Sequence, residues 1–291
     1  MNILTFDIEE WYLESQRENR QSKYLQLNET LERILNGLDR IGIKGTFFCV
    51  GELATSFPEV VKIIVDRGHE VGCHSNIHTW LDKMDEKTLR QDTTDAIKAL
   101  EDVAGQKVTS YRAPAFSITG KNKWAIGVLA DCGIESDASI FPAARDFGGF
   151  PLFPYDVPCT ISYQGVTLKE FPIGLISVFG KKIAYSGGGY FRLIPYWLVN
   201  RTMKSRDYNI CYFHLADLIH EKHGMMTRQE YEDYFKEPGT FKNRLIRYAK
   251  SNVGTGDAFG KLQRLLSDHR FVNIREAAKQ TDWAKVKMVC L

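Results

Sequence analysis

The 291-residue sequence lacks a long apolar run, a block of like charge and a Cys-x-x-Cys pair. No segment is apolar over the roughly 20 residues that a membrane-spanning helix needs, so we expect no transmembrane segment. The formal net charge of +2 predicts no polyanionic partner, and nucleic acid is therefore not expected. Internal repeats, low-complexity stretches and an obvious linker are also missing. We therefore expect a single domain over residues 1–291.

The six cysteines are scattered and lie mostly inside apolar segments, which is typical of reduced core residues. The first residues, MNILTFDIEEW, are neither a basic-then-apolar signal peptide nor a membrane anchor. Together these two features lead us to expect a cytoplasmic protein.

Short apolar segments rich in β-formers alternate with longer segments of helical period, which is the pattern of consecutive βα units. Seven strands are predicted, at 2–7, 45–50, 69–74, 108–112, 134–139, 168–173 and 209–214. Helices are predicted at 29–40, 57–66, 85–103, 122–132 and 194–205, with start signals at Ser56 and Asp85. Strands joined largely by helices predict a parallel α/β sheet, either open or closed, and we favour the closed barrel.

The remaining segments are less regular. Residues 143–167 and 175–190 are rich in Gly, Pro and aromatics, and we interpret them as long loops or an added hairpin. Residues 218–278 alternate helical stretches with turns and end in RFVNIREAA, where we expect a last strand and helix.

Ionisable residues recur where the predicted strands end. Because α/β folds place their sites at the carboxyl edge of the sheet, these side chains are expected to share one rim. The candidates are Asp7 with Glu9 and Glu10, His74 with His78, Arg112, Asp137 and His214.

The two histidines of GHEVGCHSNIHTW are four residues apart, at His74 and His78. This spacing puts both imidazoles on one face of either a helix or a strand. Two imidazoles and one carboxylate leave open positions around a divalent first-row metal, as in catalytic zinc sites. The acids at positions 7, 9 and 10 make such a site the favoured interpretation of the rim.

Five segments together resemble the polysaccharide deacetylases of carbohydrate esterase family 4: TFDIEEW, GTFFCVG, HSNIH, RAPAF and FHLAD, in the family's order. The resemblance implies a distorted seven-stranded (β/α) barrel with added loops or a hairpin and a helical C-terminal segment. DIEEW, SGGGYFRLIPY and the basic helical tail further resemble a branch associated with exopolysaccharide and surface-glycan biosynthesis.

The metal ligands that the resemblance implies are His74, His78 and one acid. The family's first motif usually reads TFDDG, but position 8 here is isoleucine. Glu9 is our first choice for the missing ligand, because it points to the same side of a strand as Asp7, and Glu10 is the second. Zinc is the expected metal, with cobalt, nickel or manganese as alternatives.

The catalytic roles follow in the same way. The resemblance assigns Asp7 as general base, Arg112 as the group that aims it, and His214 as general acid. Of the family's fourth motif, Asp137 is carried over without the usual tryptophan. Pro114 matches the third motif, whereas Phe116 stands where a tyrosine is common; both are expected near substrate.

Three further aromatics are candidates for the walls of a sugar cleft, on their sequence position beside the motifs or beside a glycine turn: Trp11, Trp80 and Tyr190. The expected reaction is hydrolytic removal of an N-acetyl group from an amino sugar. The expected substrate is a glycan or glycan precursor, with peripheral contact to a lipid-linked substrate left open.

Two other functions fit the same residues. One is an allantoinase-like amidohydrolase that cleaves a non-sugar C–N bond on the same fold. The other is a catalytically silent glycan-binding barrel, in which Ile8 and the incomplete fourth motif have dismantled the site.

Overall fold

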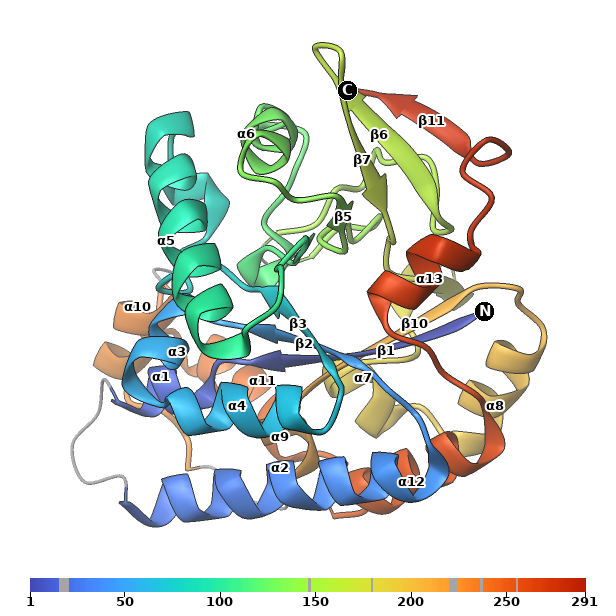
Figure 1. Ribbon diagram of the computed structural model, residues 1–291. Coiled ribbons are helices and arrows are strands. Elements are labelled where there is room, and N and C mark those ends of the chain that lie inside the picture. The colour runs from blue at the N-terminus through green and yellow to red at the C-terminus, as the bar shows by residue number, and fades with distance from the viewer. Residues whose placement is uncertain (16–20, 146–147, 179, 220–223, 236–237, 255) are drawn as a thin grey trace.

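A computed structural model describes residues 1–15, 21–145, 148–178, 180–219, 224–235, 238–254 and 256–291. Its main sheet has nine strands in the order β10-β1-β2-β3-β4-β5-β7-β6-β11 (Figure 1). The strands are β1 Asn2–Ile8, β2 Thr46–Cys49, β3 Glu70–Cys73, β4 Ser110–Tyr111, β5 Ser136–Asp137, β6 Cys159–Tyr163, β7 Val166–Glu170, β10 Asn209–His214 and β11 Lys287–Cys290.

The seven predicted strands correspond to β1–β5, β7 and β10, and each runs parallel to its neighbours among these seven. The predicted parallel α/β architecture is therefore confirmed. In the part of the chain that the structure describes, no ladder joins β10 to the opposite edge strand, β11, so the barrel is not closed by strand pairing.

Two hairpins extend this parallel sheet. β6 and β7 are antiparallel, and β11 adds to β6 at the sheet edge. A separate hairpin joins β8, Leu175–Val178, to β9, Lys181–Ala184. The expectation of an added hairpin is confirmed twice, whereas β11 was not predicted.

The helices are α1 Glu10–Ser15, α2 Gln21–Ile41, α3 Gly51–Ser56, α4 Pro58–Asp66, α5 Glu86–Ala104, α6 Ala125–Asp131, α7 Gly188–Leu193, α8 Tyr196–Lys204, α9 Leu215–Leu218, α10 Arg228–Phe235, α11 Phe241–Asn252, α12 Ala258–Asp268 and α13 Ile274–Gln280. Asp85 caps α5 as predicted, since its carboxylate accepts the Thr88 N–H at 2.8 Å. Ser56 is not a cap, because it ends α3 and Phe57 precedes α4.

Side chains alternate across β1 and thereby separate two cores. Leu4, Phe6 and Ile8 pack against the helices outside the sheet, and the Phe6 ring stacks on Phe47 at 4.9 Å between centroids. Ile3 belongs to a second cluster enclosed by the sheet. Asp7 is four residues after Ile3 and therefore lies on the same side of β1. Its side chain faces the enclosed side of the sheet, near the end of the strand.

The helix predicted within RFVNIREAA is α13, and it lies against the amino ends of the strands. Its Ile274 N–H donates to Thr46 Oγ1 at the start of β2, and its Arg275 N–H donates to Glu70 at the start of β3. The expected strand is reduced to one bridge, between Val272 and Ile3. α13 thus covers the end of the sheet opposite the predicted rim.

All six cysteines are free thiols. As expected for core residues, Cys49, Cys73, Cys159 and Cys211 are buried. Cys290 contradicts the expectation, because it is exposed on β11.

We expect acid to weaken the fold through His69. Its Nδ1 accepts the Gly45 N–H at 3.1 Å, and burial together with nearby Lys44 lowers its pKa to about 4. The unfolded chain binds this proton near pH 6.5, so the free energy of unfolding should fall by about 3 kcal/mol as the pH drops from 6.5 towards 4.

Urea denaturation near neutral pH and near pH 4, for the wild type and for His69→Asn, would measure this contribution. Asparagine keeps an acceptor for the Gly45 N–H but does not titrate, so the variant should lose less stability on acidification. An equal loss in both proteins would contradict the assignment to His69.

Candidate active site

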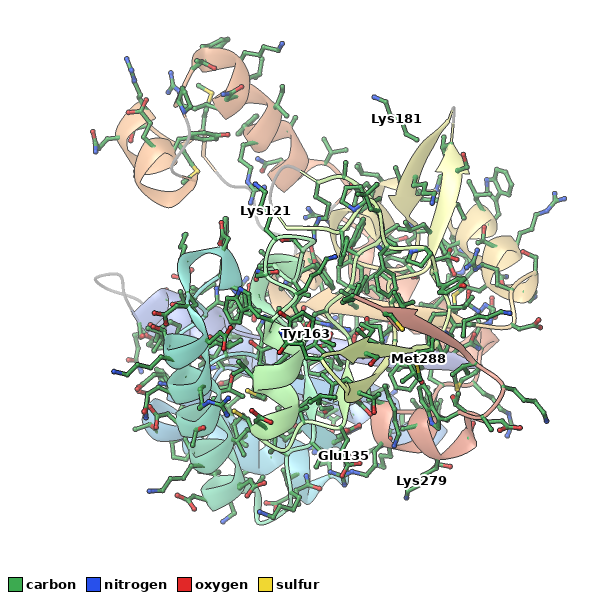
Figure 2. The ribbon with its side chains drawn as sticks, turned by 90° about the horizontal axis from the view of Figure 1, so that it is seen from above. Lys121, Glu135, Tyr163, Lys181, Lys279 and Met288 are labelled. Atoms are coloured by element: carbon green, nitrogen blue, oxygen red, sulfur yellow. The ribbon has the colours of Figure 1, made fainter. Side chains whose placement is uncertain are left out.

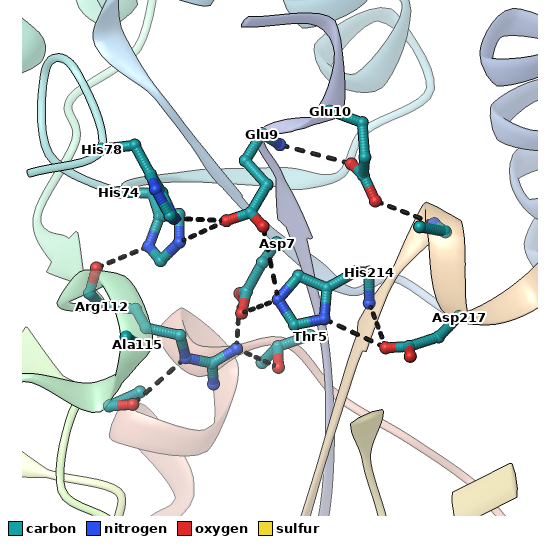
Figure 3. Close-up of polar contacts among 12 residues, drawn as sticks. Thr5, Asp7, Glu9, Glu10, His74, His78, Arg112, Ala115, His214 and Asp217 are labelled. Atoms are coloured by element: carbon teal, nitrogen blue, oxygen red, sulfur yellow. Dashed lines mark hydrogen bonds and ion pairs between the residues drawn. The ribbon is translucent and has the colours of Figure 1, made fainter. Parts of the chain in front are cut away.

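The structure brings the predicted rim residues together at the carboxyl ends of four strands (Figure 3). Asp7 on β1 and His214 on β10 are direct partners in the parallel register. His74 follows β3 and Arg112 follows β4. These residues are far apart in the chain, and it is the strand order β10-β1-β2-β3-β4 that makes them neighbours.

Arg112 holds Asp7 in a buried ion pair. Its Nη1 lies 2.7 Å from Asp7 Oδ1 and donates to Thr5 Oγ1 at 2.8 Å, while its Nε donates to the Ala138 carbonyl at 3.1 Å. The guanidinium also stacks over Phe48, 4.4 Å from the ring centroid. Charge-assisted bonds of this kind fix the direction of the carboxylate and leave Oδ2 turned towards His214.

Glu9 joins the two histidines. Its Oε2 is 2.6 Å from His78 Nε2 and 3.2 Å from His74 Nε2, and the three ligand atoms lie within 4.8 Å of one another. The Nδ1 of His74 is 2.7 Å from the Arg112 carbonyl, to which it donates. That hydrogen bond directs the Nε2 lone pair towards Glu9.

This donor set fits a divalent metal. Because Nδ1 of His74 donates to a carbonyl, Nε2 is the ring nitrogen left to bind a cation, and the Glu9 carboxylate supplies a second ligand atom beside it. A histidine whose second nitrogen donates to a backbone carbonyl is the usual arrangement around protein-bound metals. Glu9, His74 and His78 would therefore hold the ion.

The loop between the histidines is strained and tightly anchored. Ser75 and His78 have positive φ values of 65° and 57°. Asp92 on α5 accepts hydrogen bonds from the Ser75 hydroxyl and from the Asn76 N–H, at 3.3 and 2.9 Å. Backbone strain in a surface loop persists when its surroundings determine it, and here α5 supplies that support.

The choice between Glu9 and Glu10 is clear from their directions. Glu10 turns away from the histidines, and its Oε1 accepts the Ala216 N–H at 2.9 Å (Figure 3). Burial and the neighbouring Glu9 charge raise the pKa of Glu10 to about 7. Glu10 therefore ties α1 to the segment after His214, and Glu9 alone faces the candidate metal position.

His214 lies between Asp7 and the candidate metal position. Its Nε2 lies 3.7 Å from both Asp7 Oδ2 and Glu9 Oε1, and its Nδ1 lies 3.0 Å from Asp217 Oδ2. Asp217 also accepts the backbone N–H of His214 at 3.2 Å, so it both orients the ring and completes a capping box in which His214 is the N-cap of α9. The His214 side chain is 31% exposed, which leaves it open to substrate.

The charges of this cluster are strongly coupled. Burial opposes the charged form of His214, but Glu9, Asp217 and Asp7 raise its pKa well above the usual range. Burial likewise opposes the charge on Glu9, yet His78 and His214 hold its pKa well below the usual range. The rim thus pairs ionised carboxylates with a protonated imidazole, as an acid–base site requires.

Two of the predicted placements are corrected. Trp11 is not a cleft wall, because it is 1% exposed, packs in the outer core and donates its indole N–H to Asn28. Within the described residues, Asp137 lies near Arg112 but forms no hydrogen bond to Asp7, Arg112 or His214. It is buried against Ser139 and Glu170, and burial raises the pKa of both acids.

The other predicted substrate contacts remain predictions. Pro114 is buried, and Phe116 packs edge-on against Tyr212 beneath the Arg112 guanidinium. Trp80 is half-buried, with the Lys83 ammonium 4.4 Å from its ring centroid. Tyr190 on α7 is half-buried against both cores.

Sequence reasoning missed two positioning residues of the site. The Thr5 hydroxyl accepts a hydrogen bond from Arg112 and donates one to the Cys211 carbonyl. Thr5 is two residues before Asp7 in β1 and therefore lies on the same side of the strand, which is a signal that could have identified it. Asp92 lies within a helix of ordinary amphipathic pattern, where no local signal distinguishes it from a surface acid.

Two family models cover the chain between them. Residues 2–135 match the Polysaccharide deacetylase model, and residues 138–279 match Domain of unknown function (DUF3473). The first match contains Asp7, Glu9, His74, His78 and Arg112, whereas His214 and Asp217 lie outside it.

Curated relatives match a segment of similar size. The peptidoglycan-N-acetylglucosamine deacetylase of Bacillus cereus is 35% identical over 98 residues, which is 33% of this chain and 36% of that protein. The peptidoglycan deacetylase of Helicobacter pylori is 31% identical over 84 residues, 29% of each protein. The matches thus span about a third or less of these relatives.

Among solved structures, a candidate polysaccharide deacetylase from Mycobacterium smegmatis superposes with a TM-score of 0.65 at 20% identity, over 100% of this chain and 92% of that one. This likeness shows a shared fold along the whole chain. Residues 2–135 thus match the polysaccharide deacetylase family, in agreement with the resemblance to carbohydrate esterase family 4.

Proposed function

We propose that this protein is a metal-dependent hydrolase that removes the N-acetyl group from an amino sugar of a glycan or glycan precursor. The observation that carries the proposal is the convergence of a candidate metal-ligand set, the buried Asp7 carboxylate and the His214 imidazole on one rim. The names of the relatives, which are peptidoglycan deacetylases, support the same class of reaction.

A divalent ion on Glu9, His74 and His78 would supply Lewis acidity, polarising the acetamido carbonyl and lowering the pKa of water at the site. Zinc is the first choice for a ligand set of two imidazoles and a carboxylate, and cobalt, nickel or manganese remain alternatives.

Asp7 has the position of a general base. Arg112 occupies its Oδ1, so Oδ2 is the oxygen that takes a proton from the attacking water. The ion pair keeps this carboxylate aimed at the rim, and no reorientation is needed during the reaction. The water oxygen then forms the new bond to the acetyl carbon.

His214 has the position of the general acid. The Asp217 carboxylate holds its Nδ1, which directs Nε2 towards the space between Asp7 and Glu9. When the C–N bond breaks, Nε2 donates its proton to the leaving amine. Amide and water thus become acetate and a free amino sugar, and Asp7 and His214 return to their starting states by proton exchange with solvent.

The substrate class is the finer part of the proposal. The resemblance of DIEEW and SGGGYFRLIPY to an exopolysaccharide and surface-glycan branch favours an N-acetylated polymer or its precursor. A cytoplasmic location remains a prediction from the sequence.

Acetate release tests the reaction. Purified protein should release acetate from N-acetylglucosamine oligomers or peptidoglycan fragments, lose this activity after chelation and regain it with Zn²⁺. De-acetylated glucosamine oligomers are the matched substrate control. Release of product from allantoin or other cyclic amides alone would favour the non-sugar amidohydrolase. Saturable sugar binding without turnover in any metal form would favour the silent barrel.

A further inference from the structure

Helix α11 presents its apolar side chains to solvent. Six large apolar side chains between residues 225 and 253 are each between 41% and 61% exposed: Met225, Phe241, Leu245, Ile246, Tyr248 and Val253. Phe241, Leu245 and Tyr248 have the i, i+4, i+7 spacing that places them on one helix face. In α12, by contrast, the apolar residues Leu262 and Leu265 are buried in the core. The apolar face of α11 thus belongs to neither hydrophobic core, and at least 41% of each of its side chains is exposed.

The charge of this segment has one sign. Residues 238–256 include four basic residues, Lys242, Arg244, Arg247 and Lys250, and no acidic residue. Lys242 is exposed, and Arg244 donates to the Met226 carbonyl at 3.1 Å, which joins α11 to the segment before α10. A helix with an exposed apolar face and basic flanks is suited to the surface of an anionic membrane.

The length of α11 decides between lying on a bilayer and crossing it. Twelve residues extend about 18 Å, well short of the roughly 30 Å hydrocarbon core. None of the described helices is both long and apolar enough to cross a membrane. Any insertion is therefore at the interface, with the helix parallel to the membrane plane.

The position of α11 agrees with this role. Figures 1 and 2 show α10 and α11, coloured orange, on the same side of the molecule as α1, which follows the carboxyl end of β1. In Figure 2 the two helices project away from the sheet at the upper left, whereas Met288 on β11 lies right of the centre, well away from them.

We propose that α11 docks the protein on an anionic lipid surface, inserting Phe241, Leu245 and Tyr248 between headgroups while its basic residues contact lipid phosphates. Such docking would present the rim to glycans attached to lipid. The docking itself does not depend on the proposed reaction, because it is measured without turnover.

Co-sedimentation with vesicles tests the proposal. The wild type should bind vesicles of phosphatidylcholine containing one third phosphatidylglycerol much more tightly than vesicles of phosphatidylcholine alone, and raising the salt from about 0.05 M to about 0.5 M should weaken binding. Phe241→Ser/Leu245→Ser should weaken it at least about tenfold, because two inserted side chains are lost. Lys242→Glu should weaken it about fivefold or more.

Met288→Ser is the matched control, since Met288 is 58% exposed on β11, far from α11 in Figure 2. It should bind vesicles like the wild type, and circular dichroism should show all variants folded. Absence of vesicle binding at low salt, or equal binding by the double serine variant, would overturn the proposal. A wild-type dimer that the double variant converts to a monomer, without vesicle binding, would assign the face to a second copy instead.

Discussion

Replacing Asp7 by asparagine is expected to lower kcat for acetate release by about 10²–10⁴-fold, the usual contribution of a general base. Asparagine can still accept the hydrogen bond from Arg112, which in the wild type joins Nη1 to Oδ1 over 2.7 Å. It cannot take a proton from water at the position of Oδ2. The loss should therefore appear in kcat, measured as initial rates at saturating N-acetylglucosamine oligomer.

The substitution also removes the charge that balances a fully buried guanidinium. Arg112 is 0% exposed, so the free energy of unfolding should fall by about 3 kcal/mol. Activity is therefore compared well below the melting temperature of the variant, with metal content measured on the same sample. Unchanged metal content would separate the loss of the base from a loss of metal.

Asp137→Asn is the control for this experiment. Asp137 is also buried near Arg112, but its carboxyl faces Ser139 and Glu170. We expect its kcat to stay close to that of the wild type. A D7N variant that retains more than a tenth of wild-type kcat would refute the base assignment, and an equal loss in D137N would attribute it to disturbance of Arg112.

The second large effect concerns the metal ligands. Glu9→Ala and His78→Ala should each weaken metal binding by at least about 10²-fold, because loss of a ligand should cost at least as much as loss of a hydrogen-bonding partner around it. Elemental analysis after dialysis should find about one metal per wild-type chain and almost none in the variants. Acetate release should disappear with the metal.

Glu10→Gln provides the matched comparison, since Glu10 is adjacent in sequence and buried but turned towards Ala216. Glutamine can still accept the Ala216 N–H, so the variant should keep its metal. The triad would be wrong if Glu10→Gln lost the metal while Glu9→Ala kept it. Metal bound equally by all three variants and the wild type would place the ion elsewhere.

Much of the rim could be predicted because its geometry depends on local rules. The side-chain period of a strand puts Asp7 and, beyond the strand end, Glu9 on one side, and parallel strands bring their carboxyl ends to one edge. The spacing of His74 and His78 indicated a metal site only together with the neighbouring acids and the family motifs. These inferences required only that the strands run parallel to one another, and the structure confirms that they do.

The errors concern residues whose surroundings are set by distant segments. Trp11 turns inwards because α1 packs on α2, where Asn28 accepts its indole N–H. Asp137 pairs with Glu170 because β5 lies next to β7, which are partners at this position in the register. Asp92 supports the histidine loop from α5. Pairings of this kind depend on the tertiary arrangement, which hydrophobic periodicity does not encode.

The shared oxygen of Asp217 links catalysis to local unfolding. Oδ2 accepts the His214 backbone N–H at the start of α9 and also holds the ring at Nδ1, so both hydrogen bonds are lost when this four-residue helix frays. Whenever α9 unfolds, the His214 imidazole therefore loses its fixed orientation. On the proposed mechanism, only molecules in which α9 is folded are active. Mild heat or denaturant should therefore inactivate the protein before it unfolds globally, and amide protection at α9 should set the temperature range of its activity.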